Sequence, residues 1–363
     1  MPSNAHPSGE WLLIQLGVGQ IGAAVMATMQ RMATVWQERF GVTFRYHAVA
    51  DSSGFAPLTS ALAADGRPLA SLPGGIPAQE WRDVLEQVGR AAGGPERVIV
   101  VDCAVGRETT PLLLAARAAG AHVVLCNKDP LTGPYEQFQA LQGESGRGSL
   151  HLSATVGAGL PITSAVAAAT ASGDMVFEMR AVASGTLGHL CAYMSDGVAF
   201  SAALQSAIEA GYCEPDPRSD LSGRDVARKL VILARLAGHR ADSSDIEIES
   251  LIPPGTEVWP RDAFLSSLPS WHDHLADRIT TARVTGMALR YIGVMTANGV
   301  ISARLRMVAH DDPLARGSGP ENVFILHTTR YQEYPLVVAG PGAGVAVTAG
   351  AVVSDILRAA GAV

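Results

Sequence analysis

The residues most able to do chemistry gather in one stretch, residues 212–229, which reads Y-C-E-P-D-P-R-S-D-L-S-G-R-D-V-A-R-K and is called here the acid–lysine segment. Its acids could bind an ammonium group, and its lysine could move a proton. Two prolines exclude a helix before Ser219, and Asp220 or Ser222 is placed to cap one. A 3.6-residue period then predicts an amphipathic helix over residues 224–237.

Asp225 and Lys229 lie four residues apart on one flank of this predicted helix, a flank bounded by Ile232, Leu233 and Leu236. Apolar neighbours on both sides favour a partly buried pair. A lysine in that position is a candidate acid/base. The alternative is a solvated surface pair, worth about 0.3–0.5 kcal/mol.

A second chemical motif stands near the N-terminus. Residues 12–16 predict a strand, residues 17–22 read G-V-G-Q-I-G and are called the glycine loop, and a helical pattern follows to about residue 37. In G-x-G-x-x-G the glycines permit a tight turn, approach of a pyrophosphate and close helix–strand packing. We therefore predict a dinucleotide site with these binding residues: Gly17, Gly19, Gln20, Ile21 and Gly22.

The second predicted strand, residues 44–50, ends at Asp51. Rossmann domains usually place there an acid that binds the ribose 2′-hydroxyl and repels a 2′-phosphate, which favours NAD over NADP. The sequence D-S-S-G is equally typical of a turn that the aspartate caps.

Alternating helices and strands extend this first domain, with elements expected at 76–91, 97–101, 111–119 and 121–126. Such alternation is typical of a doubly wound parallel sheet of the Rossmann type. Ligands of these sheets bind at the carboxyl ends of the strands. Cys103, Ala104 and Lys128 are therefore candidate cofactor contacts.

The second half is predicted to be an α+β domain. Its entrance, A-T-V-G-A-G-L-P at residues 154–161, is a glycine-rich turn that suits a second phosphate loop or a hinge between domains. Strands of a mostly antiparallel sheet are expected at 176–183, 246–251, 282–294, 301–308 and 323–329. An open sheet of this kind is a natural surface for a homodimer.

Composition excludes several classes of function. The chain has 363 residues, 48% of them hydrophobic, which favours two domains, and its net charge of −7 without a basic run argues against nucleic acid or a membrane surface as partner. A small-molecule substrate fits better. Scattered cysteines and the lack of a signal or spanning segment lead us to expect a cytoplasmic protein.

Residues 211–229 resemble the homoserine dehydrogenase pattern G-Y-x-E-P-D-P-x-x-D-L-x-G-x-D-V-A-R-K, and residues 154–162 and 340–344 are similar to its A-T-V-G-A-G-L-P-I and G-P-G-A-G segments. The resemblance covers nearly the whole chain. It implies a monofunctional enzyme without a regulatory C-terminal domain that reversibly oxidises L-homoserine to L-aspartate 4-semialdehyde with NAD or NADP. That reaction serves aspartate-family biosynthesis, namely of threonine, methionine and isoleucine.

The resemblance also implies an arrangement of domains. Residues 1–150, completed by a C-terminal helix at 340–363, would bind NAD(P). Residues 151–339 would bind the substrate and form the dimer.

Roles carried over from the family fall on single residues. Glu214 and Asp225 would bind the substrate, with Asp220 as a further acid and Thr186 beside it. Lys229 would serve as acid/base. Two more roles follow for residues elsewhere in the chain: Lys128 as a second active-site cation, and Gly342 over the nicotinamide.

The same resemblance assigns the turn at residues 153–160, called the cation turn, to a monovalent cation, Na⁺ or K⁺. Its ligands would be backbone carbonyls, which depend little on side chain: Ser153, Val156, Ala158 and Leu160. The family often has an acid where this chain has Ser153.

Two functions of other classes stay open. One is a lyase or isomerase that keeps NAD bound and recycles it, and the other is a non-catalytic NAD(P)-binding sensor, for which a Rossmann fold would suffice. Neither G-x-S-x-G nor H-E-x-x-H occurs, so an esterase and a zincin are unsupported.

Overall fold

The computed structural model describes residues 9–52, 54–57, 78–143, 148–242, 246–271, 274–317 and 319–363. The chain forms two compact units. Unit 1 comprises the residues up to Gly159 together with Gly344–Val363, and unit 2 is Leu160–Ala343. Among the described residues, no helix is both long and apolar enough to cross a membrane.

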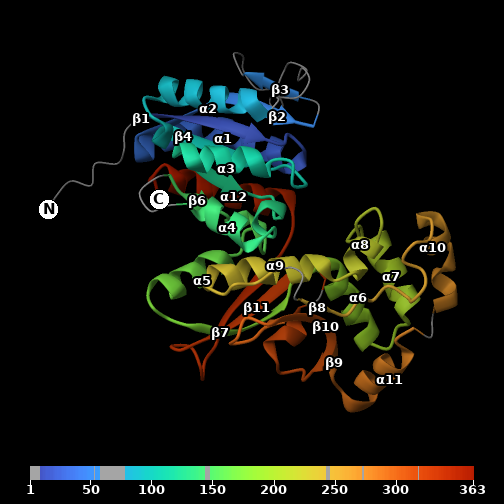
Figure 1. Ribbon diagram of the computed structural model, residues 1–363. Helices are drawn as coiled ribbons and strands as arrows, with labels where there is room; N and C mark the ends of the chain where they lie inside the picture. The colour runs from blue at the N-terminus through green and yellow to red at the C-terminus, as the bar shows by residue number, and fades with distance from the viewer. Residues whose placement is uncertain are drawn as a thin grey trace. The chain divides into compact units, whose positions relative to one another are not determined.

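Unit 1 is built on a sheet whose described strands follow the order β3-β2-β1-β4-β5-β6. The strands are β1 (Gly9–Leu16), β2 (Val42–Asp51), β3 (Gly54–Pro57), β4 (Val98–Asp102), β5 (His122–Leu125) and β6 (Leu150–His151). All neighbours pair in parallel except β2 with β3. The predicted doubly wound parallel sheet is thereby confirmed (Figure 1).

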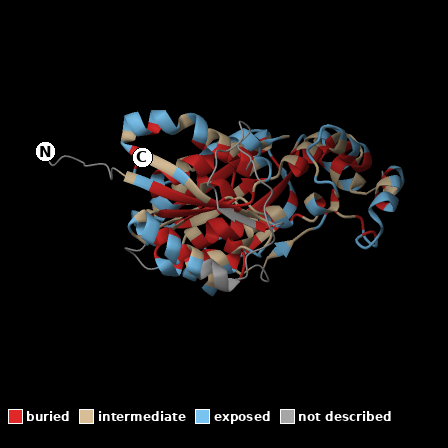
Figure 2. Cartoon of the chain, turned by 90° about the horizontal axis from the view of Figure 1, so that it is seen from above, coloured by how far each residue is buried: buried red, intermediate tan, exposed pale blue. Residues whose placement is uncertain are grey.

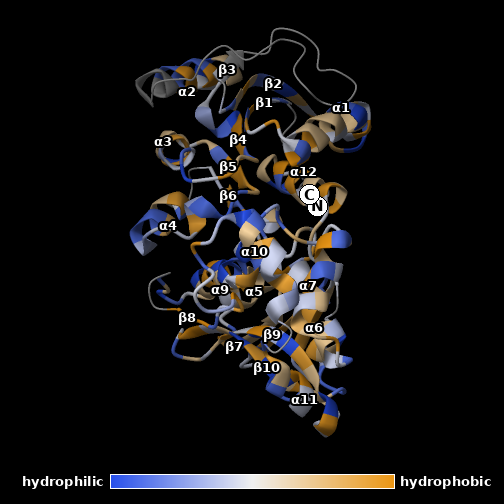
Figure 3. Cartoon of the chain, turned by 90° about the vertical axis from the view of Figure 1, so that its right-hand side faces the viewer, coloured by the Kyte–Doolittle hydropathy of each residue, from blue (hydrophilic) through white to orange (hydrophobic). Residues whose placement is uncertain are grey.

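Helices cover this sheet: α1 (Gln20–Phe40), α2 (Ala78–Ala92), α3 (Thr110–Ala119), α4 (Tyr135–Gln142) and α12 (Val345–Ala359). Residues 76–77 of the predicted helix 76–91 lie outside the described residues. The C-terminal helix α12 contacts α1, β4 and β5 and buries Val352 and Ile356 completely. Figure 2 shows buried strands between helices whose outer faces are exposed, and Figure 3 shows the hydrophobic colour of β4 and β5.

One predicted element of unit 1 is shorter than expected. The strand predicted over residues 149–153 is only two residues long in β6, and Ser153–Thr155 form a 3-10 turn instead. The backbone leaves the sheet there because Thr155 N donates to Leu152 O at 3.0 Å, which closes a helical turn. The cation turn therefore begins directly at the sheet edge.

Unit 2 has a sheet in the order β12-β11-β7-β9-β10-β8 over its described strands. They are β7 (Val176–Val182), β8 (Glu247–Ile248), β9 (Ala288–Met295), β10 (Ile301–Val308), β11 (Glu321–Thr328) and β12 (Leu336–Pro341). The pairs are antiparallel except β10 with β8, so the predicted mostly antiparallel sheet is confirmed.

The helices of unit 2 are α5 (Ile162–Ala171), α6 (Gly185–Ser195), α7 (Phe200–Glu209), α8 (Arg218–Leu221), α9 (Arg224–Leu236), α10 (Arg261–Ser267) and α11 (Ala276–Thr285). Helix α9 contacts α5, β9 and β10. A Cβ on Gly293 of β9 would lie 2.5 Å from Leu230 Cδ1, so a glycine is needed for α9 to approach. Two predicted strands differ here: residues 282–285 belong to α11, and the strand expected over 246–251 is only the two residues of β8; α6 was not predicted.

Candidate active site

The three glycines of the glycine loop in unit 1 are needed for two different reasons. Gly17 has φ 88°, and a Cβ on it would lie 2.6 Å from Ala104 N, whereas a Cβ on Gly22 would lie 2.2 Å from Gly17 O. A Cβ on Gly19 would have no described heavy atom within 4 Å. Packing thus requires the outer glycines, and the middle one leaves room for a ligand such as a pyrophosphate. Gln20 and Ile21 open helix α1, exposed and half-buried respectively.

Gln15, which the sequence analysis missed, holds this loop in shape. Its buried Nε2 donates to Gly17 O at 3.1 Å and to Gly22 O at 3.0 Å, and its Oε1 accepts from Tyr46 Oη at 3.0 Å. Burial raises the pKa of Tyr46 well above its ordinary value, so the phenol remains a donor. The available signal was a glutamine inside an otherwise apolar strand.

Asp51 lies at the end of β2, where the sequence placed it. Its Oδ1 accepts from Gly54 N at 3.2 Å. This is the turn-capping role that the sequence left as an alternative, and it leaves the ribose role a prediction.

Asp102 ties together the ends of β4 and β5. This buried carboxylate accepts hydrogen bonds from Ala104 N (2.9 Å), Thr109 Oγ1 (2.7 Å) and Asn127 Nδ2 (3.2 Å). Burial raises the pKa of Asp102, and these hydrogen bonds counteract the shift. The loops that carry the predicted residues Cys103, Ala104 and Lys128 are therefore fixed to one carboxylate at the ligand-binding edge of the sheet.

The cation turn is anchored by a residue that the sequence analysis missed. Ser153 donates from N to Asp355 Oδ2 at 2.7 Å and from Oγ to Asp355 Oδ1 at 2.8 Å. Asp355 belongs to α12 and is 1% exposed; burial raises its pKa, and the bonds from Ser153 oppose the rise. The buried carboxylate beside Ser153 thus comes from the other end of the chain.

Further along the turn the backbone bends sharply. Gly157 has φ 74° and Ala158 φ 54°, two consecutive left-handed residues between Val156 and Leu160. Such bending redirects carbonyls, which are the ligand type that a hard cation takes. The described residues contain no cluster of three or more His, Cys, Asp or Glu side chains suited to a metal ion. Backbone oxygens are therefore the donors to consider.

In unit 2, α9 carries the predicted pair. Lys229 Nζ lies 2.8 Å from Asp225 Oδ2 and donates to Ala183 O at 2.6 Å. Lys229 is 8% exposed, as the apolar flank predicted, whereas the Asp225 side chain is 48% exposed. Within the described residues these contacts engage two of the three ammonium hydrogens, which leaves one donor direction for a ligand.

The remaining acids of the acid–lysine segment play unequal parts. Asp220 Oδ2 accepts from Glu214 N at 2.9 Å, and its Oδ1 lies 2.9 Å from Thr186 Oγ1, which is also 2.6 Å from Tyr212 O. Burial raises the pKa of Asp220, and the bonds from Glu214 N and Thr186 counteract the rise. Asp220 and Thr186 thus hold the loop, while Glu214 is exposed.

The start of α9 differs from the expectation. Asp220 does not cap it; the N-cap is Gly223 with φ 69°, and Ser222 Oγ only accepts from Arg224 N at a long 3.4 Å. A Cβ on Gly223 would lie 1.9 Å from Tyr291 Oη, so a buried tyrosine fixes this position sterically. A helix already begins at Arg218, one residue before the limit set from the prolines, because Pro217 itself serves as N-cap.

Gly342 follows β12, and a close neighbour leaves no space for a side chain at this position. Its N donates to Pro320 O at 3.0 Å, and a Cβ on it would lie 1.9 Å from Asn322 Nδ2. Asn322 is 1% exposed. The glycine therefore has a packing reason, and its place over a nicotinamide stays a prediction.

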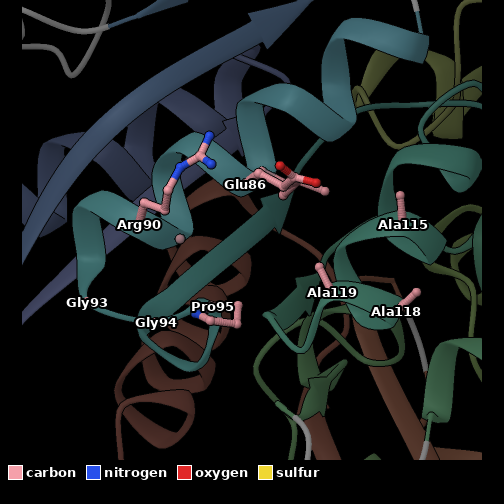
Figure 4. Close-up of a pocket in the computed structure, with 10 residues that line it drawn as sticks. Glu86, Arg90, Gly93, Gly94, Pro95, Ala115, Ala118 and Ala119 are labelled. Carbon is pink, nitrogen blue, oxygen red and sulfur yellow. The ribbon is translucent and has the colours of Figure 1, made fainter.

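A cavity of about 800 Å³ in unit 1 lies apart from all the predicted site residues. Figure 4 shows Glu86 and Arg90 of α2, and Ala115, Ala118 and Ala119 of α3, among the residues that line it. Its lining is mostly glycine, alanine and aliphatic carbon. The lining contains no lysine and none of the predicted site residues.

Two family models match the chain. Residues 17–151 match the model described as homoserine dehydrogenase, NAD binding domain, and residues 161–357 match the model described as homoserine dehydrogenase. The second match covers more than half of the chain.

Curated relatives include longer proteins. The chain is 35% identical over 362 residues to bifunctional aspartokinase/homoserine dehydrogenase 2, chloroplastic, of Zea mays, covering 95% of this chain and 38% of the relative. It is 34% identical over 357 residues to bifunctional aspartokinase/homoserine dehydrogenase 2 of Escherichia coli, covering 96% and 43%. The chain thus spans less than half the length of these relatives.

Solved structures share the fold. A Candida auris protein of unknown function superimposes with a TM-score of 0.86 at 27% identity, over 98% of this chain and 99% of that one. A hyperthermophilic archaeal homoserine dehydrogenase in complex with NADPH gives a TM-score of 0.72 at 22% identity, over 97% and 98%, which shows likeness of fold alone.

Proposed function

Because the chain belongs to the homoserine dehydrogenase family, we propose that it catalyses the reversible NAD(P)-dependent oxidation of L-homoserine to L-aspartate 4-semialdehyde. This step would serve the biosynthesis of aspartate-family amino acids. The observation that carries the proposal is the buried Lys229, held between the Asp225 carboxylate and the Ala183 carbonyl. Burying a cation costs free energy even when it is paired, and charged groups kept in such places cluster at functional sites.

Lys229 is the proposed acid/base for the substrate hydroxyl. In the oxidation, neutral Lys229 takes the hydroxyl proton as the hydride leaves carbon; in the reduction its ammonium returns the proton to the carbonyl oxygen. The bound nicotinamide supplies the hydride acceptor. Asp225 and Ala183 O orient Nζ by their hydrogen bonds, so that one donor direction remains for substrate oxygen.

The charged ends of the substrate need partners of their own. Glu214 presents an exposed carboxylate beside Asp220 and is the proposed ligand of the substrate ammonium. Thr186 and Asp220 are proposed to hold that loop and to border the substrate. Lys128, in unit 1, is proposed to orient the hydroxyl or share its proton transfer.

Dinucleotide binding is assigned to unit 1 by the match over residues 17–151. We propose that the pyrophosphate sits at Gly19, where a Cβ would meet open space, and at the first turn of α1. Asp51 is proposed to favour NAD over NADP, although the related archaeal structure carries NADPH. Cys103, Ala104 and Gly342 are proposed to border the nicotinamide half.

Three further properties belong to the proposal. Carbonyls of Ser153, Val156, Ala158 and Leu160 would bind Na⁺ or K⁺, supported by the left-handed bend at residues 157–158. A homodimer would form through the sheet of unit 2, supported by the exposed apolar side chain of Val337 on β12, which is 42% exposed. A cytoplasmic location is supported by free thiols at all four cysteines.

The experiment is a spectroscopic assay of NAD(P) reduction with L-homoserine. We expect steady net formation of NAD(P)H in proportion to substrate consumed. Substrate consumed without net NAD(P)H would indicate a lyase or isomerase that recycles its cofactor, and cofactor binding without turnover would indicate a sensor. Either result would overturn the proposal.

A further inference from the structure

Two cysteines stand side by side at the ligand-binding edge of unit 1. Cys103 is the first residue after β4, and Cys126 is the first after β5. The strands pair in parallel with Asp102 opposite Leu125, and Cys126 N donates to Asp102 O at 2.8 Å. The cysteines are thus the next facing pair along the two strands. Neighbouring strands are spaced about 4.8 Å apart, within the Cα separation that a disulfide spans.

The two thiols are chemically unequal. The neighbouring Cys103 thiol and then the charge of Lys128 lower the pKa of Cys126, against opposing effects of burial and Asp102. The neighbouring Cys126 thiol, together with burial, raises the pKa of Cys103 well above its ordinary value. A thiol of lowered pKa beside a second thiol is the arrangement in which one sulfur attacks as a thiolate and the other resolves.

The other two cysteines provide an internal contrast. Cys191 is fully buried, and burial raises its pKa to about 12. Burial likewise raises the pKa of Cys213 to about 12. Cys103 and Cys126 are both partly exposed, as Cys213 is, so an oxidant can reach them; unlike Cys213, they face each other as a pair.

We propose that Cys103 and Cys126 are a reversible disulfide-forming modification site that controls the dinucleotide site. The Cys126 thiolate attacks one oxygen of hydrogen peroxide, which forms a sulfenic acid and releases hydroxide that takes up a proton to become water. The Cys103 thiol then attacks the Cys126 sulfur, forms the S–S bond and releases a second water. Two thiols are oxidised by two electrons, and one peroxide is reduced to two waters.

The disulfide acts on the cofactor through Gly17. The carbonyl carbon of Cys103 and the N of Ala104 each lie 2.6 Å from the position of a Cβ on Gly17, and Cys103 N donates to Leu16 O at 2.7 Å. An S–S bond of about 2.05 Å draws the two thiols together. The Cys103 backbone must then shift against Gly17, where the glycine loop has no spare room, which weakens dinucleotide binding.

The first measurement is covalent and needs no activity. Reduced protein is treated with hydrogen peroxide, and peptides are mapped by mass spectrometry. We expect a linked pair of peptides, lighter by two hydrogens, that contains Cys103 and Cys126 and reverts with dithiothreitol. Cys126→Ser must lose the link, whereas the matched control Cys213→Ser must keep it. Oxidation of Cys126 to sulfinic acid without any link in the wild-type protein would overturn the proposal.

The second measurement is the Kd for NADH, titrated with reduced and oxidised wild-type protein. We expect oxidation to raise Kd by roughly threefold or more and dithiothreitol to restore it. An unchanged Kd in fully linked protein would refute control of the cofactor site. This inference rests on the proposed function only for the cofactor; failure of the reduced protein to oxidise L-homoserine would refute that function and leave both readouts intact.

Discussion

The glycine loop and the acid–lysine segment solve different problems. In the glycine loop the proposed binding groups are backbone, and the constraint is space: Cβ atoms on Gly17 and Gly22 would collide with backbone, whereas one on Gly19 would not. In the acid–lysine segment the groups are side chains, and distant residues hold them. Ala183 O accepts from Lys229, and Tyr291 packs on Gly223.

This difference explains what each stretch reveals in sequence. A site made of backbone is specified by local residue types, because glycine is needed wherever a Cβ cannot fit. A site made of side chains also depends on residues far along the chain. Substitutions in the glycine loop should therefore distinguish residues that leave space for the ligand from residues needed for packing. Substitutions in the acid–lysine segment should distinguish residues that do chemistry from residues that support them.

The largest effect is expected at Lys229. Lys229→Ala should lower kcat for L-homoserine by about 10²–10⁴-fold, because the group that moves the proton is lost. Alanine keeps helix propensity, so the fold should survive. Steady-state kinetics and NADH titration measure this, with Arg224→Ala on the same helix as the matched control. Equal losses of kcat in both variants would show that any substitution on α9 lowers activity, and would not support an acid/base role for Lys229.

Within the glycine loop, two valines should act differently. Gly19→Val should raise the Kd for NAD(P) at least tenfold with little change in Tm, because its side chain enters ligand space alone. Gly22→Val should cost stability by about 1–3 kcal/mol or more, because its Cβ would overlap Gly17 O. Paired calorimetry and cofactor titration decide. Similar losses of Tm in both variants would show that Gly19, like Gly22, is needed for packing.

Much of the fold could be predicted from sequence for the same reason that the glycine loop could. The buried strands β4 and β5 and the period of α9 are local patterns. Helix α11 was misread because its T-T-A-R-V-T sequence is β-branched, yet burial of Ile279 and Ala282 and the left-handed cap at Gly286 make it a helix. Helix α6 was missed because it holds two glycines and is buried on several sides.

At the site, the limit was long-range pairing. The helical period predicted that Asp225 and Lys229 meet, since four residues separate them. Nothing local indicated that Asp355 would bind Ser153, because 202 residues separate the two. Such contacts are decided by tertiary packing.

The cation turn tests whether a backbone site can depend on a distant side chain. Asp355→Asn should keep the volume but weaken the hold on Ser153, so stimulation of the proposed activity by Na⁺ or K⁺ should fall several-fold. Rates at constant ionic strength, with a bulky organic cation as reference, measure this. If the variant retained the full stimulation by Na⁺ or K⁺, the role of Asp355 would be limited to the packing of α12.

Stability should depend on pH through unit 1, away from the glycine loop and the acid–lysine segment. His122 Nδ1 and His151 Nε2 each lie 2.6 Å from Ser149 Oγ, and His122 Nε2 donates to Glu96 O at 3.1 Å. Burial first, then nearby positive groups, lowers the pKa of both histidines from 6.5 to about 4. Between these two pKa values the unfolded chain therefore binds more protons than the folded chain does.

Stability should accordingly be constant above pH 6.5 and fall as the pH drops toward 4. Tm across that window, with hydrogen exchange to locate the loss in unit 1, checks this. His122→Gln should flatten the slope. A Tm that rises on acidification would have the wrong sign for neutral buried histidines.

The smallest effect is expected at Asp51. Asp51→Ala removes a repulsive charge and a proposed ribose contact, so the ratio of kcat/KM for NADP to that for NAD should rise a few-fold. Asp51 also caps a turn through Gly54 N, so Asp51→Asn, which retains a side-chain oxygen, is the control. An unchanged ratio would leave Asp51 with the turn alone.

The most direct test of the central claim is chemical rescue of Lys229→Ala. If Lys229 is the acid/base, small primary amines entering the space left by its side chain should restore NAD(P) reduction with L-homoserine in a concentration-dependent manner, and the rescue should vary with the pKa of the amine. The matched control Arg224→Ala should not respond. Near wild-type kcat in folded Lys229→Ala at every pH, or no rescue by any amine that binds, would contradict the role assigned to Lys229.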